Sequence, residues 1–222
     1  MKKTLLLPTL CLLCLSGIAQ SSIISVNFNR SNQLFTTEVA GVEPAANWNH
    51  VLSNSQTGTT VLNNLVDNSG SATSTSITTF NAFWYDKENL SSTDGRMFSH
   101  YTNTSADTAG TINISGLSSN FTNNGYKVIV YLGGTDSMGE NTAAEFGASI
   151  NSDTQWIRYL RPGSGQVAYD SFSSTTFSSE QDAETSGTNS QYITFEGLTS
   201  SDFDLNILPD PDSSSSWARA GV

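Results

Sequence analysis

The sequence predicts an all-β protein, a two-sheet antiparallel β-sandwich of jelly-roll-like type. Three observations favour this class. The chain is rich in Ser, Thr, Asn and Gly, and its 11 Phe, 7 Tyr and 4 Trp recur at strand-like spacing. Short apolar or alternating runs are separated by frequent turn residues. No long window has a helical period, so any helix should be a single turn or two.

The N-terminus has the pattern of a secretory signal peptide. Two lysines precede an apolar run that is shorter than the roughly 20 residues needed to cross a bilayer, and small residues end the run at Ala19. We therefore predict a signal peptide over 1–19, a single domain over 20–222, and a secreted or cell-surface location, extracellular or periplasmic. Cys11 and Cys14 leave with the signal, so the mature chain would contain no disulfide.

Charge excludes several classes of partner. Removal of the signal leaves seven basic against 20 acidic residues, so no basic patch remains to bind phosphates. Nucleic acid and anionic membranes are therefore disfavoured, and the mature chain is not expected to insert into a membrane. In TQWIRYLRPG, alternation places Trp156, Arg158 and Leu160 on one face, and the arginines are expected to pair with surface carboxylates. The sequence makes no prediction of oligomeric state.

The strands are expected in order along the chain. The first run, SIISVNF, has Ile24, Val26 and Phe28 on one face and predicts a strand over 22–28. Later strands are expected at 73–80, 96–101, 111–114, 127–132, 144–150, 155–160, 192–195 and 203–208. In the last of these, three apolar residues alternate with three polar ones, which predicts an antiparallel strand with one solvated face: Phe203, Leu205 and Ile207 against Asp202, Asp204 and Asn206.

The segment GTINISGLSSNFTNNGYKVIVYLGG contains two strands and a turn. Ile112 and Ile114 alternate with polar residues, and the step Asn123-Asn124-Gly125 tolerates positive φ. The following run, YKVIVYL, is almost entirely apolar, which predicts a central strand.

The segment AGVEPAANWNHV places a tryptophan between two amides. We expect a loop that enters a strand, with Trp48 folded inward over the sandwich. Asn47 and Asn49 would then bond backbone groups of the loop. A ligand-binding role for this element is the alternative.

Several segments in this order resemble a group of uncharacterised secreted β-sandwich modules of environmental bacteria: SVNFN, AGVEPAANWNHV, NNLVDNSGSATSTSITT, ISGLSSNFTNNGYKVIVYLGG and WARAGV. Such modules often accompany extracellular carbohydrate-active or surface-anchored proteins. The resemblance implies the fold and the compartment, and no catalytic residues. Because members of that group continue into a last apolar strand, it also implies a fragment or a truncated last strand at Val222.

Catalytic patterns are weak. His50 and His100 have no cysteine beside them, and no Gly-x-Ser-x-Gly elbow is present. Paired carboxylates could support glycoside hydrolysis at Asp86/Glu88, Asp136/Glu140 or Asp202/Asp204. The last pair should lie side by side on a solvated face, with no burial to raise one pKa. A hydrolase or lyase is therefore the third choice of function.

Oxygen-rich loops make a structural calcium ion the cofactor to consider. The residues selected as ligands lie in GGTDSMGEN: Asp136, Glu140 and Asn141. Similar loops contain Asp67 with Asn68, and Asp210 with Asp212. The competing interpretation is that these residues are ordinary turn formers.

The segment FNAFWYDKEN is the richest cluster of side chains suited to sugar binding. Aromatic faces bind the apolar side of a pyranose, and amides or carboxylates bind its hydroxyls. The residues selected as glycan ligands are Trp84, Tyr85, Asp86, Glu88 and Asn89. The leading hypothesis is a non-catalytic carbohydrate-binding or adhesive module. The alternative is a structural domain in which these rings are buried.

Overall fold

The computed structural model describes residues 22–29, 34–52, 58–80, 83–85, 92–98, 100–102, 109–133, 143–160 and 172–211. The strands in these ranges are β1 (Val26–Asn29), β2 (Asn49–Leu52), β3 (Thr59–Leu62), β4 (Ser76–Phe80), β5 (Phe83–Tyr85), β6 (His100–Thr102), β7 (Gly110–Ser115), β8 (Tyr126–Tyr131), β9 (Ala143–Ile150), β10 (Asp153–Leu160), β11 (Tyr192–Leu198) and β12 (Phe203–Leu208). The helices are α1 (Thr93–Phe98), α2 (Ser119–Thr122) and α3 (Glu180–Ser186). None of the described helices is long and apolar enough to cross a membrane.

Six strands form one antiparallel sheet in the order β10-β9-β12-β7-β4-β3. The alternation predicted for 202–208 is confirmed, because Phe203, Leu205 and Ile207 are buried while Asp204 is exposed. Alternate side chains of a strand point to opposite faces, so this pattern directs one face of the sheet into the core.

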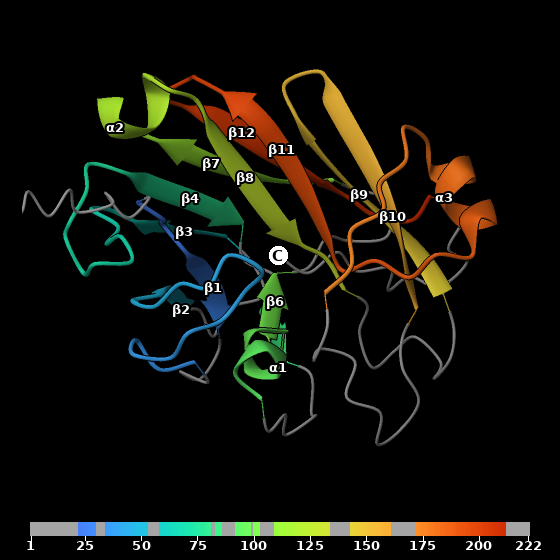
Figure 1. The fold of residues 1–222 in the computed structure, drawn as a ribbon, viewed down its shortest axis with the longest axis horizontal. Helices are drawn as coiled ribbons and strands as arrows, with labels where there is room; N and C mark the ends of the chain where they lie inside the picture. Colours follow the sequence, from blue (N-terminus) through green and yellow to red (C-terminus); the bar gives the residue numbers. More distant parts are fainter. Residues whose placement is uncertain are drawn as a thin grey trace, which may run out of the picture.

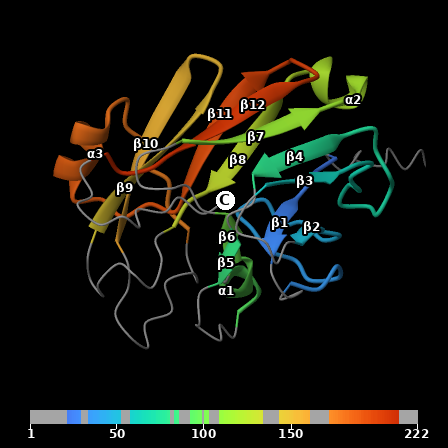
Figure 2. The same cartoon turned by 180° about the vertical axis from the view of Figure 1, so that it is seen from behind.

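A second layer lies over the inner face of this sheet. It contains the antiparallel pair β8–β11 and the parallel pair β1–β2, and Figures 1 and 2 show these pairs on one side of the larger sheet. The core fills the space between the layers. It joins side chains of the large sheet to side chains of the second layer: Ile112, Phe146, Leu205 and Ile207 on one side, and Phe28, Val51, Val130, Ile193 and Phe195 on the other. The predicted all-β sandwich is confirmed.

A smaller apolar cluster lies beside this core and contains Trp48. The indole is 5% exposed, and its Nε1–H donates to the carbonyl of Ala45 over 2.9 Å. The buried members of the cluster are Leu34, Ala40, Trp48 and Met97. The inward orientation predicted for Trp48 is therefore confirmed.

The amides on either side of Trp48 bond to distant backbone groups. Asn49 Nδ2 donates to the carbonyls of Ser25 and Val66, while its Oδ1 accepts from the Val66 N–H. Asn47, at φ 56°, donates from Nδ2 to the carbonyl of Asn68. The amides satisfy backbone groups, as predicted, but through the tertiary structure rather than through local Asx turns.

The prediction that YKVIVYL is a central strand is wrong. Among the described strands, β8 pairs with β11 alone, in a two-stranded sheet. Its apolar character has another cause, because its side chains contact two separate apolar clusters. Val128 and Val130 pack on the main core, and Tyr131 packs on the cluster that contains Trp48.

The strand predicted over 96–101 is also wrong in its first half. Residues 93–98 form α1, and only His100 and Tyr101 belong to a strand. Ser92 explains the difference, because its Oγ accepts from the Gly95 N–H over 3.0 Å, as a helix N-cap does. Met97 is therefore a buried residue of helix α1. The seven-residue α3 stays within the two turns predicted for any helix.

Candidate functional site

The ribbon β5–β6 brings together aromatic positions that are far apart in the sequence. Its antiparallel register pairs Phe83 with Thr102, Trp84 with Tyr101, and Tyr85 with His100. Directly opposite residues of antiparallel strands share one face. The register therefore places positions 84 and 101 on one face of the ribbon, and positions 85 and 100 on the other. The ribbon lies beside β1, and Figure 1 shows β6 next to that strand of the second layer.

The structure describes only some of the residues selected from the sequence. Trp84 and Tyr85 are the central and last positions of β5, whereas the other proposed sugar ligands lie outside the described residues: Asp86, Glu88 and Asn89. The proposed calcium ligands also lie outside them: Asp136, Glu140 and Asn141.

The Asp67 loop, one of the oxygen-rich loops, is held by its own hydrogen bonds. Asp67 Oδ1 accepts from the backbone N–H groups of Ser69 and Ser71 over 2.9 and 3.1 Å, and from Ser69 Oγ over 2.6 Å. Its Oδ2 accepts from Ser22 Oγ over 3.2 Å. The Ser69 hydroxyl contributes most to lowering the pKa of Asp67. These contacts support the interpretation of this carboxylate as a turn former rather than a calcium ligand.

Replacement of Asp67 by alanine is expected to destabilise the fold by about 1 kcal/mol, because several donors of the turn lose their acceptor. The loss should be the same with calcium and with a chelator, measured by thermal unfolding. Ser71→Ala is a matched control, because it keeps the carboxylate and the backbone donor. A chelator that destabilised the wild type but not the Asp67 variant would contradict the turn-former role.

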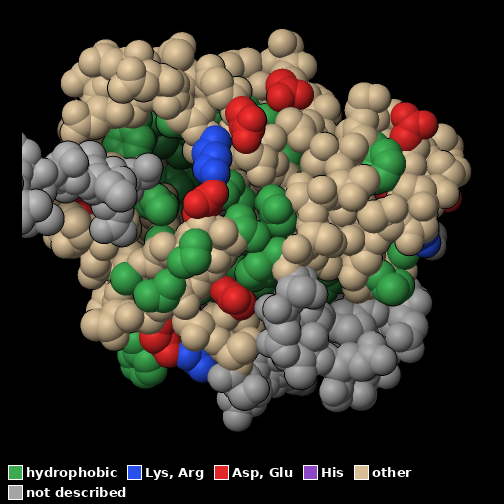
Figure 3. Space-filling view, viewed as in Figure 1, with side chains coloured by type: hydrophobic (Ala, Val, Ile, Leu, Met, Phe, Trp, Pro, Cys, Tyr) green, Lys and Arg blue, Asp and Glu red, His purple; other side chains and the backbone are tan. Residues whose placement is uncertain are grey.

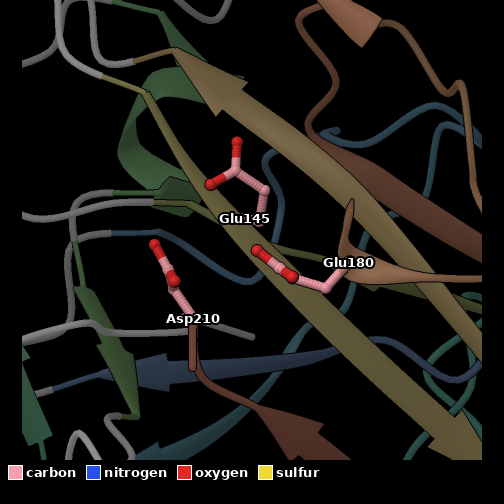
Figure 4. A group of neighbouring side chains, drawn as sticks. All are labelled: Glu145, Glu180 and Asp210. Carbon is pink, nitrogen blue, oxygen red and sulfur yellow. The ribbon is translucent and has the colours of Figure 1, made fainter. Parts of the chain in front are cut away.

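Three carboxylates from separate parts of the chain meet at one end of the large sheet. Glu145 lies on β9, Glu180 begins α3, and Asp210 follows β12. Their ligand atoms all lie within 4.8 Å of one another, and Figure 4 shows the three side chains directed toward a common space. Glu145 is 6% exposed and Asp210 is 8% exposed, so two of the three carboxylates are buried.

Local features position these carboxylates. A tight turn at Asn151, with φ 56°, sets the β9–β10 register that pairs Glu145 with Arg158. Ser179 Oγ caps α3 by accepting from the Asp182 N–H, and the fully buried Ala183 packs this helix against the sheet. The prediction that Arg158 pairs with a carboxylate is confirmed, although its partner is buried.

The electrostatics of the cluster favour a proton on Glu145. Burial is the largest cause that raises the pKa of Glu145, and the charge of Asp210 is the next. Arg158 acts in the opposite direction, and the resulting pKa is about 7. The Arg158 Nε lies 3.4 Å from Glu145 Oε1. The three carboxylates could supply ligands to a divalent cation. However, the positive charge of Arg158 would repel such a cation, and calcium takes six to eight oxygen ligands. A proton on Glu145 would relieve the repulsion among the three carboxylates and needs no further ligands.

Sequence reasoning selected Asp210 but missed Glu145 and Glu180. A signal for Glu145 existed, because a two-residue turn after Ile150 pairs Glu145 with Arg158 by register alone. Nothing local marks Glu180, since an acidic residue in the first turn of a helix is common.

The described residues do not combine into a catalytic arrangement. Asp202 is exposed, and its pKa is lowered by hydrogen bonds, of which the one from Ser201 contributes most and the one from the Gly116 N–H comes next. A carboxyl group with a lowered pKa does not hold the proton that a general acid must donate. Glu145 has a raised pKa, but its burial keeps it out of reach of a polysaccharide. His50 lies on β2, and burial lowers its pKa. The pairs Asp86/Glu88 and Asp136/Glu140 lie outside the described residues.

The fold and these two sites define an all-β sandwich with an aromatic ribbon and a buried carboxylate cluster. Comparison of the chain with protein-family models, with curated proteins and with solved structures finds no match.

Proposed function

We propose that the chain is a secreted, non-catalytic β-sandwich module that binds carbohydrate, or adheres through it, at the cell surface or outside the cell. The proposed binding site is the ribbon β5–β6. The observation that carries the proposal is the register of the ribbon, which groups the aromatic positions 84 and 101 on one face.

The chemistry of the ribbon suits a sugar better than it suits other ligands. Rings contribute apolar contact to the faces of a pyranose, and polar side chains beside them bind hydroxyls. Asp86, Glu88 and Asn89 follow β5 directly in the sequence and would contribute such groups. The signal-peptide pattern over residues 1–19 supports delivery to a compartment where polysaccharides are found.

The absence of a catalytic arrangement among the described residues supports binding without turnover. A glycosidase needs one carboxyl group that stays protonated within reach of the glycosidic oxygen. Asp202 has a lowered pKa and Glu145 is buried, so neither meets both conditions.

Trp84→Ala is expected to reduce glycan binding at least tenfold, because it removes the largest ring of the ribbon. A glycan array with and without calcium identifies the ligand, and affinity electrophoresis then measures the variants. Phe35→Ala is the matched control, because this side chain is 65% exposed on a loop remote in sequence from the ribbon. The control should bind as the wild type does. Thermal unfolding shows whether each variant is folded.

Two results would contradict the proposal. The first is a wild-type protein that binds no glycan on the array under either calcium condition. The second is a Trp84→Ala variant that binds normally. A silent array combined with a large loss of stability in Trp84→Ala would favour the alternative, a structural domain of an extracellular protein in which this ring is buried.

A further inference from the structure

Two steps of the sequence place a glycine directly after an aspartate or an asparagine: Asp94-Gly95 and Asn124-Gly125. Both steps have the same intrinsic reactivity. The backbone nitrogen of the glycine can attack the side-chain carbonyl carbon of the residue before it and close a succinimide ring. Glycine favours this reaction because it has no Cβ to crowd the attacking nitrogen. The fold decides whether the two reacting groups are free to meet.

The Asp94-Gly95 step is protected by hydrogen bonds at both reacting groups. Asp94 Oδ1 accepts from the Gly41 N–H over 2.8 Å, and the Gly95 N–H donates to Ser92 Oγ over 3.0 Å. Gly95 is also a buried residue of helix α1. Ring closure at this step would therefore require both bonds to break and the first turn of the helix to open.

The Asn124-Gly125 step has neither restraint. It lies in the turn between α2 and β8, where the asparagine is exposed. Within the described ranges, no group forms a hydrogen bond with the Asn124 side chain or with the Gly125 N–H. Glycine suits this turn, because its φ of 77° lies in the left-handed region that other residues adopt only at a cost. The geometry of the turn thus places the more reactive step at the surface.

Asparagines followed by serine are the next candidates along the described chain. Asn68 is tied into the structure, because its Oδ1 accepts from the Ile23 N–H over 3.0 Å. The nitrogen that would attack it is tied as well, since the Ser69 N–H donates to Asp67 Oδ1 over 2.9 Å. Asn151 lies in the exposed turn between β9 and β10, but the serine that follows it carries a Cβ. We therefore expect both asparagines to react more slowly than the one before glycine.

We propose that Asn124 is a site of spontaneous deamidation, which converts its side-chain amide into a carboxylate while the protein stays folded. The Gly125 nitrogen attacks Cγ of Asn124, so that an N–Cγ bond forms and the Cγ–Nδ2 bond breaks. Ammonia leaves and takes up the proton that the attacking nitrogen loses. Water then opens the succinimide at either of its carbonyl groups, which gives aspartate or isoaspartate.

The two products differ in their effect on the backbone. Each adds one negative charge to a chain with 20 acidic and 9 basic residues, and Figure 3 shows red acidic side chains spread over one face with few blue ones among them. Aspartate leaves the path of the chain unchanged. Isoaspartate adds one carbon to the main chain just before Tyr126, the first residue of β8, which pairs with Leu198. The site is independent of the proposed sugar site.

The test compares reaction rates in the folded protein with rates in the same protein unfolded in guanidinium, so that intrinsic reactivity cancels. Peptide mass spectrometry after incubation at pH 8.5 measures each site. Asn124 should react at about the same rate in both states, within roughly threefold. Asn68 should react at least about tenfold more slowly when folded, the factor expected where two hydrogen bonds must first break. Isoaspartate at Asp94 should form only in the unfolded chain.

Asn124→Gln is the matched variant, because glutamine keeps the amide but would have to close a larger, less favourable ring. Anion-exchange chromatography of the folded wild type should show a more acidic form that accumulates with time, and this form should be absent from the variant. Thermal unfolding shows that both proteins are folded at the start. The proposal fails if folding slows the reaction of Asn124 tenfold or more, or if the acidic form accumulates equally in the variant.

Discussion

Trp48→Ala is expected to lower the free energy of unfolding by about 3–5 kcal/mol, as truncation of a buried aromatic side chain does. The ring is 5% exposed and packs on Leu34, Ala40 and Met97. The Nε1–H bond to the Ala45 carbonyl would be lost as well. Urea unfolding followed by circular dichroism measures the change.

Two further variants make this result specific. Trp48→Phe keeps an aromatic ring but loses the donor, and so should be destabilised less than the alanine variant. Phe35→Ala removes an exposed ring and should change stability by about 0.5 kcal/mol or less. Unchanged stability of Trp48→Ala together with lost glycan binding would contradict the structural role of Trp48 and assign it to a ligand site.

Stability is expected to depend on pH through Glu145. Its pKa is raised from 4.5 to about 7, so the folded protein holds this proton more tightly than the unfolded chain. The stabilisation is complete below the unfolded pKa and is lost as pH rises through the folded pKa of about 7. Between pH 4.5 and 8 this group should change the free energy of unfolding by about 2–3 kcal/mol, most of it between pH 5 and 8.

Other groups titrate as well, so the test compares two proteins at each pH. His50 has a lowered pKa, and therefore its contribution to stability is lost as pH falls below about 6.5, opposite to Glu145. Asp67 and Asp202 also have lowered pKa values, and their contributions are lost only in more acidic solution. The difference between wild type and Glu145→Gln isolates the glutamate.

Relative to Glu145→Gln, the wild type should lose stability steadily from pH 5 to pH 8, measured by urea unfolding. The groups that face Glu145 remain in both proteins: Arg158, Glu180, Glu184 and Asp210. Glu196→Gln controls for net charge, because this residue is exposed on β11. A difference between wild type and Glu145→Gln that is constant across this range would show that the pKa of Glu145 is not raised in the folded protein.

Period-two alternation was sufficient to predict the sheet strands that have one buried face. The strand predicted over 203–208 has the same bounds as β12, and the run predicted over 111–114 lies inside β7. Alternation is a local property, because adjacent side chains of a strand point to opposite faces and only one face enters the core. The buried alternate residues of both strands confirm this.

The apolar run of β8 was a weaker guide, because an apolar residue does not specify what covers it. A strand in the centre of a sheet and a strand buried between two apolar clusters have the same apolar composition. The structure provides the second arrangement, in which Tyr131 packs under the loop of Trp48 and its hydroxyl accepts from the Val42 N–H over 2.9 Å.

The candidate sites likewise combine features that the sequence predicts with features that depend on tertiary structure. The excess of acidic residues, the signal-peptide pattern and the aromatic segment could be found in the amino-acid order, because composition and short motifs are local properties. The pairing of Trp84 with Tyr101, and the meeting of Glu145, Glu180 and Asp210, depend on tertiary structure. These contacts join segments that are distant along the chain, and no local pattern specifies which distant segments the folded chain brings together.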